Sequence, residues 1–424
     1  MMVYFFGVVA FLFYRIAIAK DKHKAILFAS AYMIGAEVFF RMTKALVFYE
    51  TGKYVVIVFF LIGMFYYGFK KKAFSYFVYV LLLLPAVFIT YLSINYDSEF
   101  RKMIIFNLSG PICLAIASLY CYERSIKFKD FQRLLDIIVY PLIAMTVYVY
   151  LYNPDIRDVI TGTTSTSATS GGYGPNQVAT MLGLGVFILY SRLLIPYKNK
   201  LVHFIMMFFL VSMAFRALVT FSRGGVIVAV IMVAVFSLVL YLSTSIKTKF
   251  KITYKLIAVL GAVAAIWLYA LLQTGGMIEN RYTNKDALGR EKADVTTGRG
   301  RLISADFEAF QESPVFGIGV GRVKSYYIEK LNIELPSHNE LARMLSEHGA
   351  LGILALLVLL FTPIFSIIGG RRNIYFYPFI IFWALTISHS SMRIAAPAFI
   401  YALSLLNIDY EKPKNTIHRK QLTR

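Results

Sequence analysis

A short polar run, Pro336-Ser337-His338-Asn339-Glu340, contains the side chain best suited to accept a proton near neutral pH. Ser337 followed three residues later by Glu340 is a capping-box pattern, which predicts that a helix starts at His338. The positive end of that helix favours the neutral imidazole, as a general base requires. A hydrogen-bonded residue of the capping region is the plainer interpretation of a single histidine.

The other histidines are weaker candidates for a base. Only His389, in the run Ser388-His389-Ser390, is predicted to face the same side of the protein as His338. The rest lie in basic segments or within apolar runs: His23, His203, His348 and His418.

Four arginines are candidates for binding an anion. Arg223 lies in Ser222-Arg223-Gly224-Gly225 at the end of an apolar run, and the others are Arg216, Arg299 and Arg301. A guanidinium group forks onto phosphate and stays charged in low dielectric. Contact with lipid headgroups explains most such arginines singly. A group of them around one long loop instead indicates a diphosphate site.

Glu37 and Arg41 are four residues apart in one apolar run. Such a pair is either a functional site or a neutralised structural pair, and the sequence favours neither. Asp306 and Glu308 have no His or Cys at ligand spacing, so no metal site and no cofactor are predicted.

The composition indicates the class of protein fold that must hold these residues in place. The chain has 424 residues, of which 58% are hydrophobic and only 16% are charged. A soluble domain carries about a quarter charged residues, so the chain is predicted to be an all-α polytopic membrane protein. The net charge of +21 accompanies many apolar runs, which argues against a nucleic-acid partner. Cys113 and Cys121 are eight residues apart on one predicted helix, too far to bridge.

Apolar runs of spanning length predict 12 or 13 transmembrane helices. They fall at 2–19, 25–48, 54–69, 73–94, 104–122, 134–152, 177–195, 201–220, 224–243, 253–273, 346–368, 374–390 and 394–408. The last two are interrupted by polar residues at 388–393, and one broken unit is the alternative to two spans. Each run suits a hydrocarbon core of about 30 Å.

Basic residues in the connections predict the orientation. One set of alternate connections and the C-terminal tail hold 24 Lys and Arg, whereas the short connections on the other side hold 7. The richer side is predicted to be cytoplasmic, and so is the C-terminus. The N-terminus then lies outside if all 13 spans are real.

Four parts follow from this pattern. Residues 1–273 form an N-terminal transmembrane bundle of about ten spans with an outer loop at 153–176. Residues 274–345 form a large outer loop with 10 basic and 10 acidic residues, 346–408 form C-terminal transmembrane helices, and 409–424 form a basic tail. A long outer loop is usually functional, so the chemistry is expected there.

The large loop contains a recognisable series of motifs. Thr297-Gly298-Arg299 precedes an amphipathic stretch at 302–311, which Pro314 closes. Gly317, Gly319 and Gly321 follow, and glycines allow a backbone to approach a ligand closely. An earlier segment, Gly174-Pro175-Asn176, ends the Thr/Ser/Gly-rich outer loop, whose residues 161–172 either line the path of a ligand or form a linker.

These motifs, in this order, resemble the O-antigen ligase and polymerase superfamily over about residues 172–370. Arg223 and Arg299 match the arginines of that family, Asn176 matches its asparagine segment, and His338 matches its histidine. Two features differ: Ile303 stands where the family usually has an aromatic residue, and ten spans precede the loop where nine are commoner.

The resemblance implies a GT-C-like, inverting, metal-independent glycosyltransferase at the periplasmic face of the bacterial inner membrane. Its donor would be an undecaprenyl-diphosphate-linked glycan, and its acceptor a second glycan or lipid A core. The product would be lipopolysaccharide or another surface polysaccharide. His338 would be the general base. Arg223 and Arg299 would bind the diphosphate beside Arg301 and Arg216, with weaker contacts from Asn176, Asn339, Gly317 and Gly319.

Two other functions are compatible with the hydropathy. A polysaccharide flippase or transporter would need charged residues deep in its spans, and apart from Glu37 and Arg41 there are very few. A membrane scaffold that binds a partner through 274–345 would need neither His338 nor the arginines.

Overall fold

The computed structural model describes residues 1–93, 98–153, 155–194, 199–292, 294, 296, 298–335, 337–370 and 372–410. Thr297, Pro336 and the part of the predicted basic tail beyond Tyr410 lie outside the described residues.

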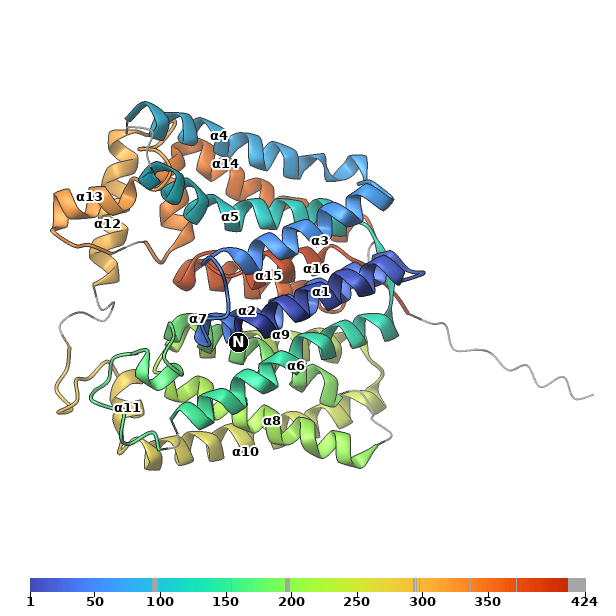
Figure 1. The fold of residues 1–424 in the computed structure, drawn as a ribbon. Helices are drawn as coiled ribbons and strands as arrows, with labels where there is room; N and C mark the ends of the chain where they lie inside the picture. Colours follow the sequence, from blue (N-terminus) through green and yellow to red (C-terminus); the bar gives the residue numbers. More distant parts are fainter. Residues whose placement is uncertain are drawn as a thin grey trace, which may run out of the picture.

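Ten helices form the N-terminal part of a helical bundle (Figure 1). They are α1 (Met2–Ile18), α2 (Lys22–Met42), α3 (Thr51–Tyr67), α4 (Ser75–Ser93), α5 (Ser98–Cys121), α6 (Phe128–Tyr152), α7 (Pro175–Leu194), α8 (Lys200–Val219), α9 (Arg223–Ser243) and α10 (Ile246–Gln273). Each predicted run before the large loop corresponds to one of these helices. The run 25–48 is predicted too long, because α2 ends at Met42.

The large loop contains three shorter helices, and the bundle then resumes. The loop helices are α11 (Met277–Tyr282), α12 (Arg299–Glu312) and α13 (Val323–Leu331). The returning helices are α14 (Glu340–Ile368), α15 (Phe376–Ser390) and α16 (Ala396–Ser404). The amphipathic stretch predicted at 302–311 is therefore a helix, and it ends at Glu312, shortly before Pro314.

Nine helices of the described part are long and apolar enough to cross a membrane, and α1, α3 and α15 are shorter apolar helices. The last helix of the bundle, α16, has only nine residues, and all of them are buried. Figure 1 shows that successive bundle helices run in alternating directions, with α11, α12 and α13 at one end. The chain is a polytopic helical membrane protein, as predicted.

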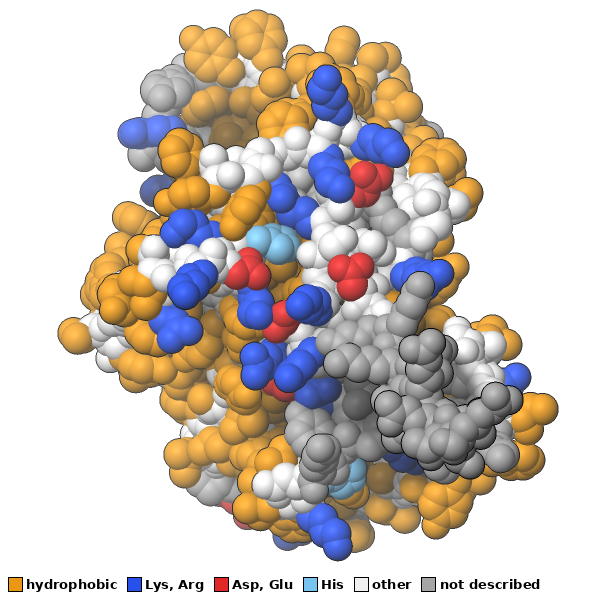
Figure 2. Space-filling model, turned by 90° about the vertical axis from the view of Figure 1, so that its right-hand side faces the viewer, with side chains coloured by type: hydrophobic (Ala, Val, Ile, Leu, Met, Phe, Trp, Pro, Cys, Tyr) orange, Lys and Arg blue, Asp and Glu red, His pale blue; other side chains and the backbone are white. Residues whose placement is uncertain are grey.

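The two ends of the bundle differ in composition. We call the end that carries 153–174 and 274–339 the loop face, and the opposite end the basic face. Figure 2 looks onto the basic face and shows Lys and Arg side chains gathered over it. The α1–α2, α3–α4 and α5–α6 connections lie there and carry basic residues of the predicted cytoplasmic set, among them Lys22, Lys70 and Arg124.

A small parallel sheet, which the all-α prediction omits, links two distant connections on the basic face. Strand β1 (Ser125–Lys127) pairs with β2 (Asn407–Asp409), Ile126 opposite Ile408. This pairing ties the α5–α6 connection to the end of α16. The remaining elements are single 3₁₀ turns at Lys71–Phe74 and Ala168–Ser170.

Candidate functional site

A buried helical hairpin lies beneath the loop face. Helix α15 ends at Ser390, α16 begins at Ala396, and the residues between them are buried apart from half-buried Arg393. Non-helical backbone at membrane depth needs polar partners from the protein itself. The prediction of one broken unit at 374–408 therefore describes this hairpin better than two full spans do.

The Glu37–Arg41 pair of α2 provides those partners. Glu37 Oε2 accepts a 2.7 Å hydrogen bond from the Ala395 amide. Arg41 Nη2 donates to the Arg393 carbonyl oxygen at 3.0 Å and to Glu37 Oε1 at 2.5 Å. Of the two interpretations left open by the sequence, the structural one fits this geometry. Lys53, one of the seven basic residues assigned from the sequence to the short outer connections, is fully buried in the first turn of α3.

Three arginines of the loop face come together from different elements. Arg223 is the first residue of α9, Arg299 is the first residue of α12, and Arg281 lies in α11. The pKa of Arg281 is lowered, mainly by burial and secondly by the positive charges of Arg223 and Arg299. Burial and then the charge of Arg223 lower the pKa of Arg299. We call Arg223, Arg281 and Arg299 the arginine cluster.

The cluster favours an anion for two reasons. Among the described residues, neither Arg281 nor Arg299 forms an ion pair with a carboxylate. Arg223 and Arg299 also lie at helix N-termini, where the helix dipole and unpaired amides attract negative charge. Like-charged groups held close together are stabilised by a ligand of opposite charge.

Sequence reasoning missed Arg281, which belongs to no motif and lies in a loop of zero net charge. The topology could have identified it. Helix α9 begins at the loop face and α10 returns there, so the residues just after α10 lie near the start of α9. Arg281 Nε donates to the Phe221 carbonyl oxygen at 3.0 Å, two residues before Arg223.

The two segments that match the family outside the large loop, at Asn176 and at Ser222–Gly225, are in contact. Ser222 Oγ donates to Asn176 Oδ1 at 2.8 Å. Gly225 lies directly against α7, where an added Cβ would be 2.6 Å from the Thr180 amide nitrogen. Gly224 lies against the ring of His389, and a Cβ there would clash with it. The two glycines therefore let α9 approach both α7 and α15.

His389, the rival to His338 as a base, has both ring nitrogens engaged. Nδ1 lies 2.7 Å from the Leu385 carbonyl oxygen, and Nε2 lies 3.3 Å from Thr180 Oγ1. The His389 ring is also close enough to Arg299 to experience its positive charge. His389 therefore packs beneath the arginine cluster as a hydrogen-bonded part of the hairpin.

Arg301 and Arg216 lie apart from the cluster. Arg301 is exposed, and its charge acts on Asp294. Arg216 is fully buried, donates from Nη2 to the Asn153 carbonyl oxygen at 2.8 Å and lies over the Tyr150 ring at 3.9 Å. The structure therefore gives Arg216 a role in fixing the 153–170 segment to α8.

The segment 161–172 is fixed to the rest of the loop face. Thr163 Oγ1 donates to the Lys285 carbonyl oxygen at 3.1 Å and accepts from Lys292 Nζ at 2.7 Å. Ser170 is fully buried and bonded to the Tyr173 carbonyl oxygen. These contacts argue against a simple linker.

The predicted helix start at His338 is wrong. Helix α14 begins at Glu340, and its N-cap is Asn339, whose Oδ1 accepts from the amides of Leu341 and Ala342. Asparagine is as good an N-cap as serine, so Ser337 and Asn339 compete and the second one caps. His338 is half-buried and precedes the helix.

Arg343 forms ion pairs with two glutamates of the same helix. Arg343 Nη1 lies 2.7 Å from Glu347 Oε2, and Nη2 pairs with Glu340 Oε1 and donates to the Asn107 carbonyl oxygen at 3.2 Å. Asp306 joins the same region to α12. It accepts from Tyr327 Oη at 2.7 Å and from Ser346 Oγ at 2.9 Å. Burial raises the pKa of Asp306 to about 6.

Gly317 and Gly319 pack against helices. Their φ angles are +73° and +99°. The Gly319 amide donates to the Glu347 carbonyl oxygen at 3.1 Å, and a Cβ on Gly319 would lie 2.6 Å from Thr90 Oγ1. Helix α14 is kinked at Gly349 to receive this turn. The close approach expected of these glycines is therefore made to α14 and α4.

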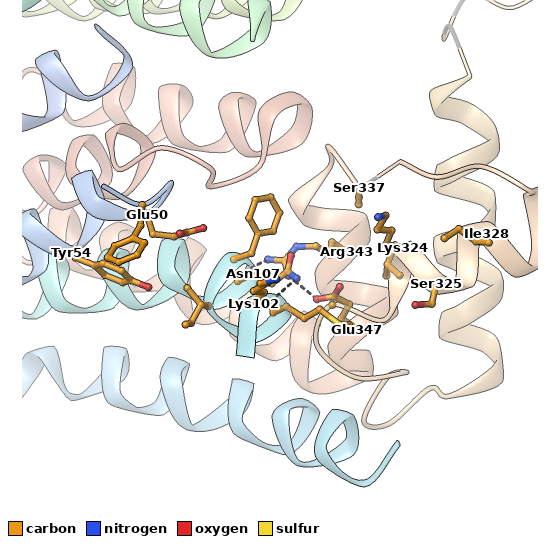
Figure 3. A pocket seen from close by; sticks show the side chains of 16 residues that line it. Glu50, Tyr54, Lys102, Asn107, Lys324, Ser325, Ile328, Ser337, Arg343 and Glu347 are labelled. Carbon is orange, nitrogen blue, oxygen red and sulfur yellow. Dashed lines mark hydrogen bonds and ion pairs between the residues drawn. The ribbon is translucent and has the colours of Figure 1, made fainter. Parts of the chain in front are cut away.

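A cavity of about 700 Å³ opens between α3, α5, α13 and the start of α14. Figure 3 shows Glu50 and Tyr54 on one side, Lys324, Ser325 and Ile328 on the other, and Arg343 with Glu347 between them. Lys102, Asn107 and Ser337 also line it. Ser337, the residue directly before His338, is part of the cavity wall. Aromatic and polar side chains together are typical of small-molecule sites.

A comparison with known protein families finds a match within the chain. The family model described as O-antigen ligase matches residues 208–357. This match to residues 208–357, here called the O-antigen ligase domain, supports the resemblance to the O-antigen ligase superfamily. No curated protein matches the chain.

The O-antigen ligase domain contains most of the candidate site. All three members of the arginine cluster, His338 and the Gly317–Gly319 turn lie within it, whereas Asn176, His389 and Arg393 lie outside. The match indicates a function of the O-antigen ligase and polymerase type, carried out in a membrane by a glycosyltransferase-type enzyme.

Proposed function

We propose that this protein transfers a glycan from undecaprenyl diphosphate to a sugar hydroxyl, with inversion at the anomeric carbon and without a metal. The observation that carries the proposal is the arginine cluster inside the O-antigen ligase domain. A diphosphate carries the charge and geometry that guanidinium groups bind best.

In the proposed reaction, the cluster binds the donor diphosphate and stabilises the charge that develops on it. The bond between the anomeric carbon and the diphosphate oxygen breaks, and the electron pair leaves with the diphosphate. Preorganised cations at the leaving group are a large source of catalysis. Undecaprenyl diphosphate is released, and its lipid stays in the bilayer throughout.

His338 is proposed as the general base. Its ring accepts the proton of the acceptor hydroxyl while that oxygen forms the new glycosidic bond from the opposite side of the anomeric carbon. A positioned base typically contributes about 10²–10⁴-fold to the rate.

The cavity beside Ser337 is proposed to receive the acceptor glycan. A base has to lie within hydrogen-bond reach of the hydroxyl that it deprotonates, so the acceptor has to bind next to His338. Tyr54 and Phe106 offer faces for sugar rings, and Lys102 and Glu50 offer polar contacts.

The membrane orientation is proposed from the basic face. Lys and Arg are enriched on cytoplasmic sides, which places the basic face and the C-terminus in the cytoplasm of a bacterial inner membrane. The loop face, with the arginine cluster and His338, then faces the periplasm, where the donor glycan is available.

A transporter is the weaker proposal. It requires charged groups along a path through the spans. Glu37 and Arg41, the pair that suggested one, are bonded to the backbone of the α15–α16 hairpin.

The proposal is tested by reconstituting the protein with a defined undecaprenyl-diphosphate glycan and supplying one acceptor at a time. Products joined to lipid A core alone indicate a ligase, and ladders of longer glycan without it indicate a polymerase. Movement of the intact donor across the vesicle membrane with no new glycosidic bond would support the transporter instead.

A further inference from the structure

We propose that Arg393 is a positioning residue for His338, and that the Glu37–Arg41 pair holds Arg393 in place. The inference rests on the proposed role of His338 as the base. It assigns a function to a buried ion pair and to an arginine that lie outside the O-antigen ligase domain and that no motif identifies.

The side chain of Arg393 fixes the backbone on one side of His338. Its Nη2 donates to the Ser337 carbonyl oxygen at 2.7 Å, and its guanidinium lies over the Phe106 ring at 5.4 Å. Ser337 is itself buried. The Asn339 N-cap fixes the other side of His338, so both of its neighbours are anchored.

The backbone of Arg393 is fixed in turn by α2. Arg41 donates to the Arg393 carbonyl oxygen, and Glu37 accepts from the Ala395 amide. Gly52 leaves room for this, because a Cβ there would lie 2.6 Å from Glu37 Cγ. Arg41 is further held by Tyr173 Oη at 3.2 Å and by the Tyr49 ring at 3.9 Å. These contacts tie the backbone of the hairpin tip to α2.

This linkage explains why charged residues are kept at membrane depth. A buried ion pair contributes little net stability compared with apolar residues of the same shape, but it fixes one geometry. Here that geometry is the distance between α2 and the segment that holds His338. A displacement of about 1 Å in a catalytic group costs on the order of 10²-fold in rate.

The expected effect is on turnover rather than on donor binding. Arg393→Ala should lower kcat by about 10–100-fold, because Ser337 and His338 are no longer held. The KM for the donor should stay within about two-fold, because the arginine cluster is unchanged. Arg393→Lys should recover part of the loss, because its ammonium reaches the same carbonyl as a single donor.

The experiment measures transfer by the full chain for Arg393→Ala, Arg393→Lys, His338→Ala and the double variant Arg393→Ala/His338→Ala. Arg124→Ala is the matched control, since Arg124 also donates to backbone carbonyls but lies on the basic face. If Arg393 acts through His338, adding Arg393→Ala to His338→Ala changes the residual rate by less than about two-fold.

A second readout does not depend on activity. In a His338→Cys chain, maleimide labelling reports position 338, because Cys113 and Cys121 are fully buried. Adding Arg393→Ala should change the labelling rate by about three-fold or more as the loop loosens.

Three results would overturn the inference: unchanged kcat and labelling in Arg393→Ala, additive losses in the double variant, or a raised donor KM that marks Arg393 as a substrate ligand. Full activity of His338→Ala is a different result, because it contradicts the proposed base while the labelling still reports on the linkage.

Discussion

Arg281 Nε donates a 3.0 Å hydrogen bond to the carbonyl oxygen of Phe221, which lies two residues before the start of α9. The contact joins the element just after α10 to the beginning of α9. It places a third guanidinium near Arg223 and Arg299, and so adds Arg281 to the residues proposed to bind the donor.

Arg281→Ala should weaken donor binding. A charge-assisted hydrogen bond is worth about 1.5–3 kcal/mol, so the KM for the lipid-diphosphate glycan should rise about 10–100-fold. Initial rates against donor concentration measure the change. Arg290→Ala is the control, because Arg290 lies in the same loop, is exposed and pairs with Asp286. Equal effects of the two substitutions would argue against a specific cluster.

Lys102→Ala should weaken acceptor binding only. Lys102 lines the cavity beside Ser337. We expect the acceptor KM to rise about ten-fold, the size of one charge-assisted contact, with the donor KM unchanged. Arg101→Ala provides the comparison, since Arg101 is the exposed neighbouring cation and does not line the cavity. A change in donor KM alone would move the acceptor away from this cavity.

Gly319→Ala should destabilise the protein. Its φ of +99° strains any L side chain, and the added Cβ would meet Thr90 and the α4 backbone. Strain and overpacking together cost about 2 kcal/mol or more. Thermal unfolding in detergent measures the loss. Gly261→Ala should be neutral or stabilising, because nothing lies within 4 Å of the added Cβ in α10. A Tm for Gly319→Ala equal to that of wild type would contradict the packing role.

Asp306 should make stability depend on pH. Burial raises its pKa from 3.8 to about 6 in the folded protein. A raised folded-state pKa means that its contribution is fully present below about pH 4 and is lost as the pH rises through about 6. Asp306→Asn should therefore lack that loss in Tm measured across this range. Glu308→Gln, exposed on the same helix, should behave as wild type. A parallel pH dependence in wild type and Asp306→Asn would contradict the assignment.

Much of the fold follows from local sequence. Apolar runs of spanning length identify the bundle helices, and the amphipathic stretch before Pro314 identifies α12. The Arg343 ion pairs follow from helical spacing of three and four residues. These features depend only on neighbours within one helix, so periodicity and charge spacing are enough to predict them.

The rest depends on contacts between distant segments. Nothing near Glu37 indicates that it meets the amide of Ala395, and Arg281 becomes a donor-site candidate only once α9 and α10 are placed side by side. The helix start predicted at His338 is wrong for a local reason, because two good capping residues lie two positions apart and the second, Asn339, is the N-cap.

The measurement that tests the proposed mechanism most directly is glycan transfer by His338→Ala in vesicles with a defined undecaprenyl-diphosphate glycan and a productive acceptor. His203→Ala, near the start of α8 on the basic face, is the control. The proposed mechanism predicts a loss of about 10²–10⁴-fold in kcat with donor binding retained. Full transfer by His338→Ala at normal expression would contradict it.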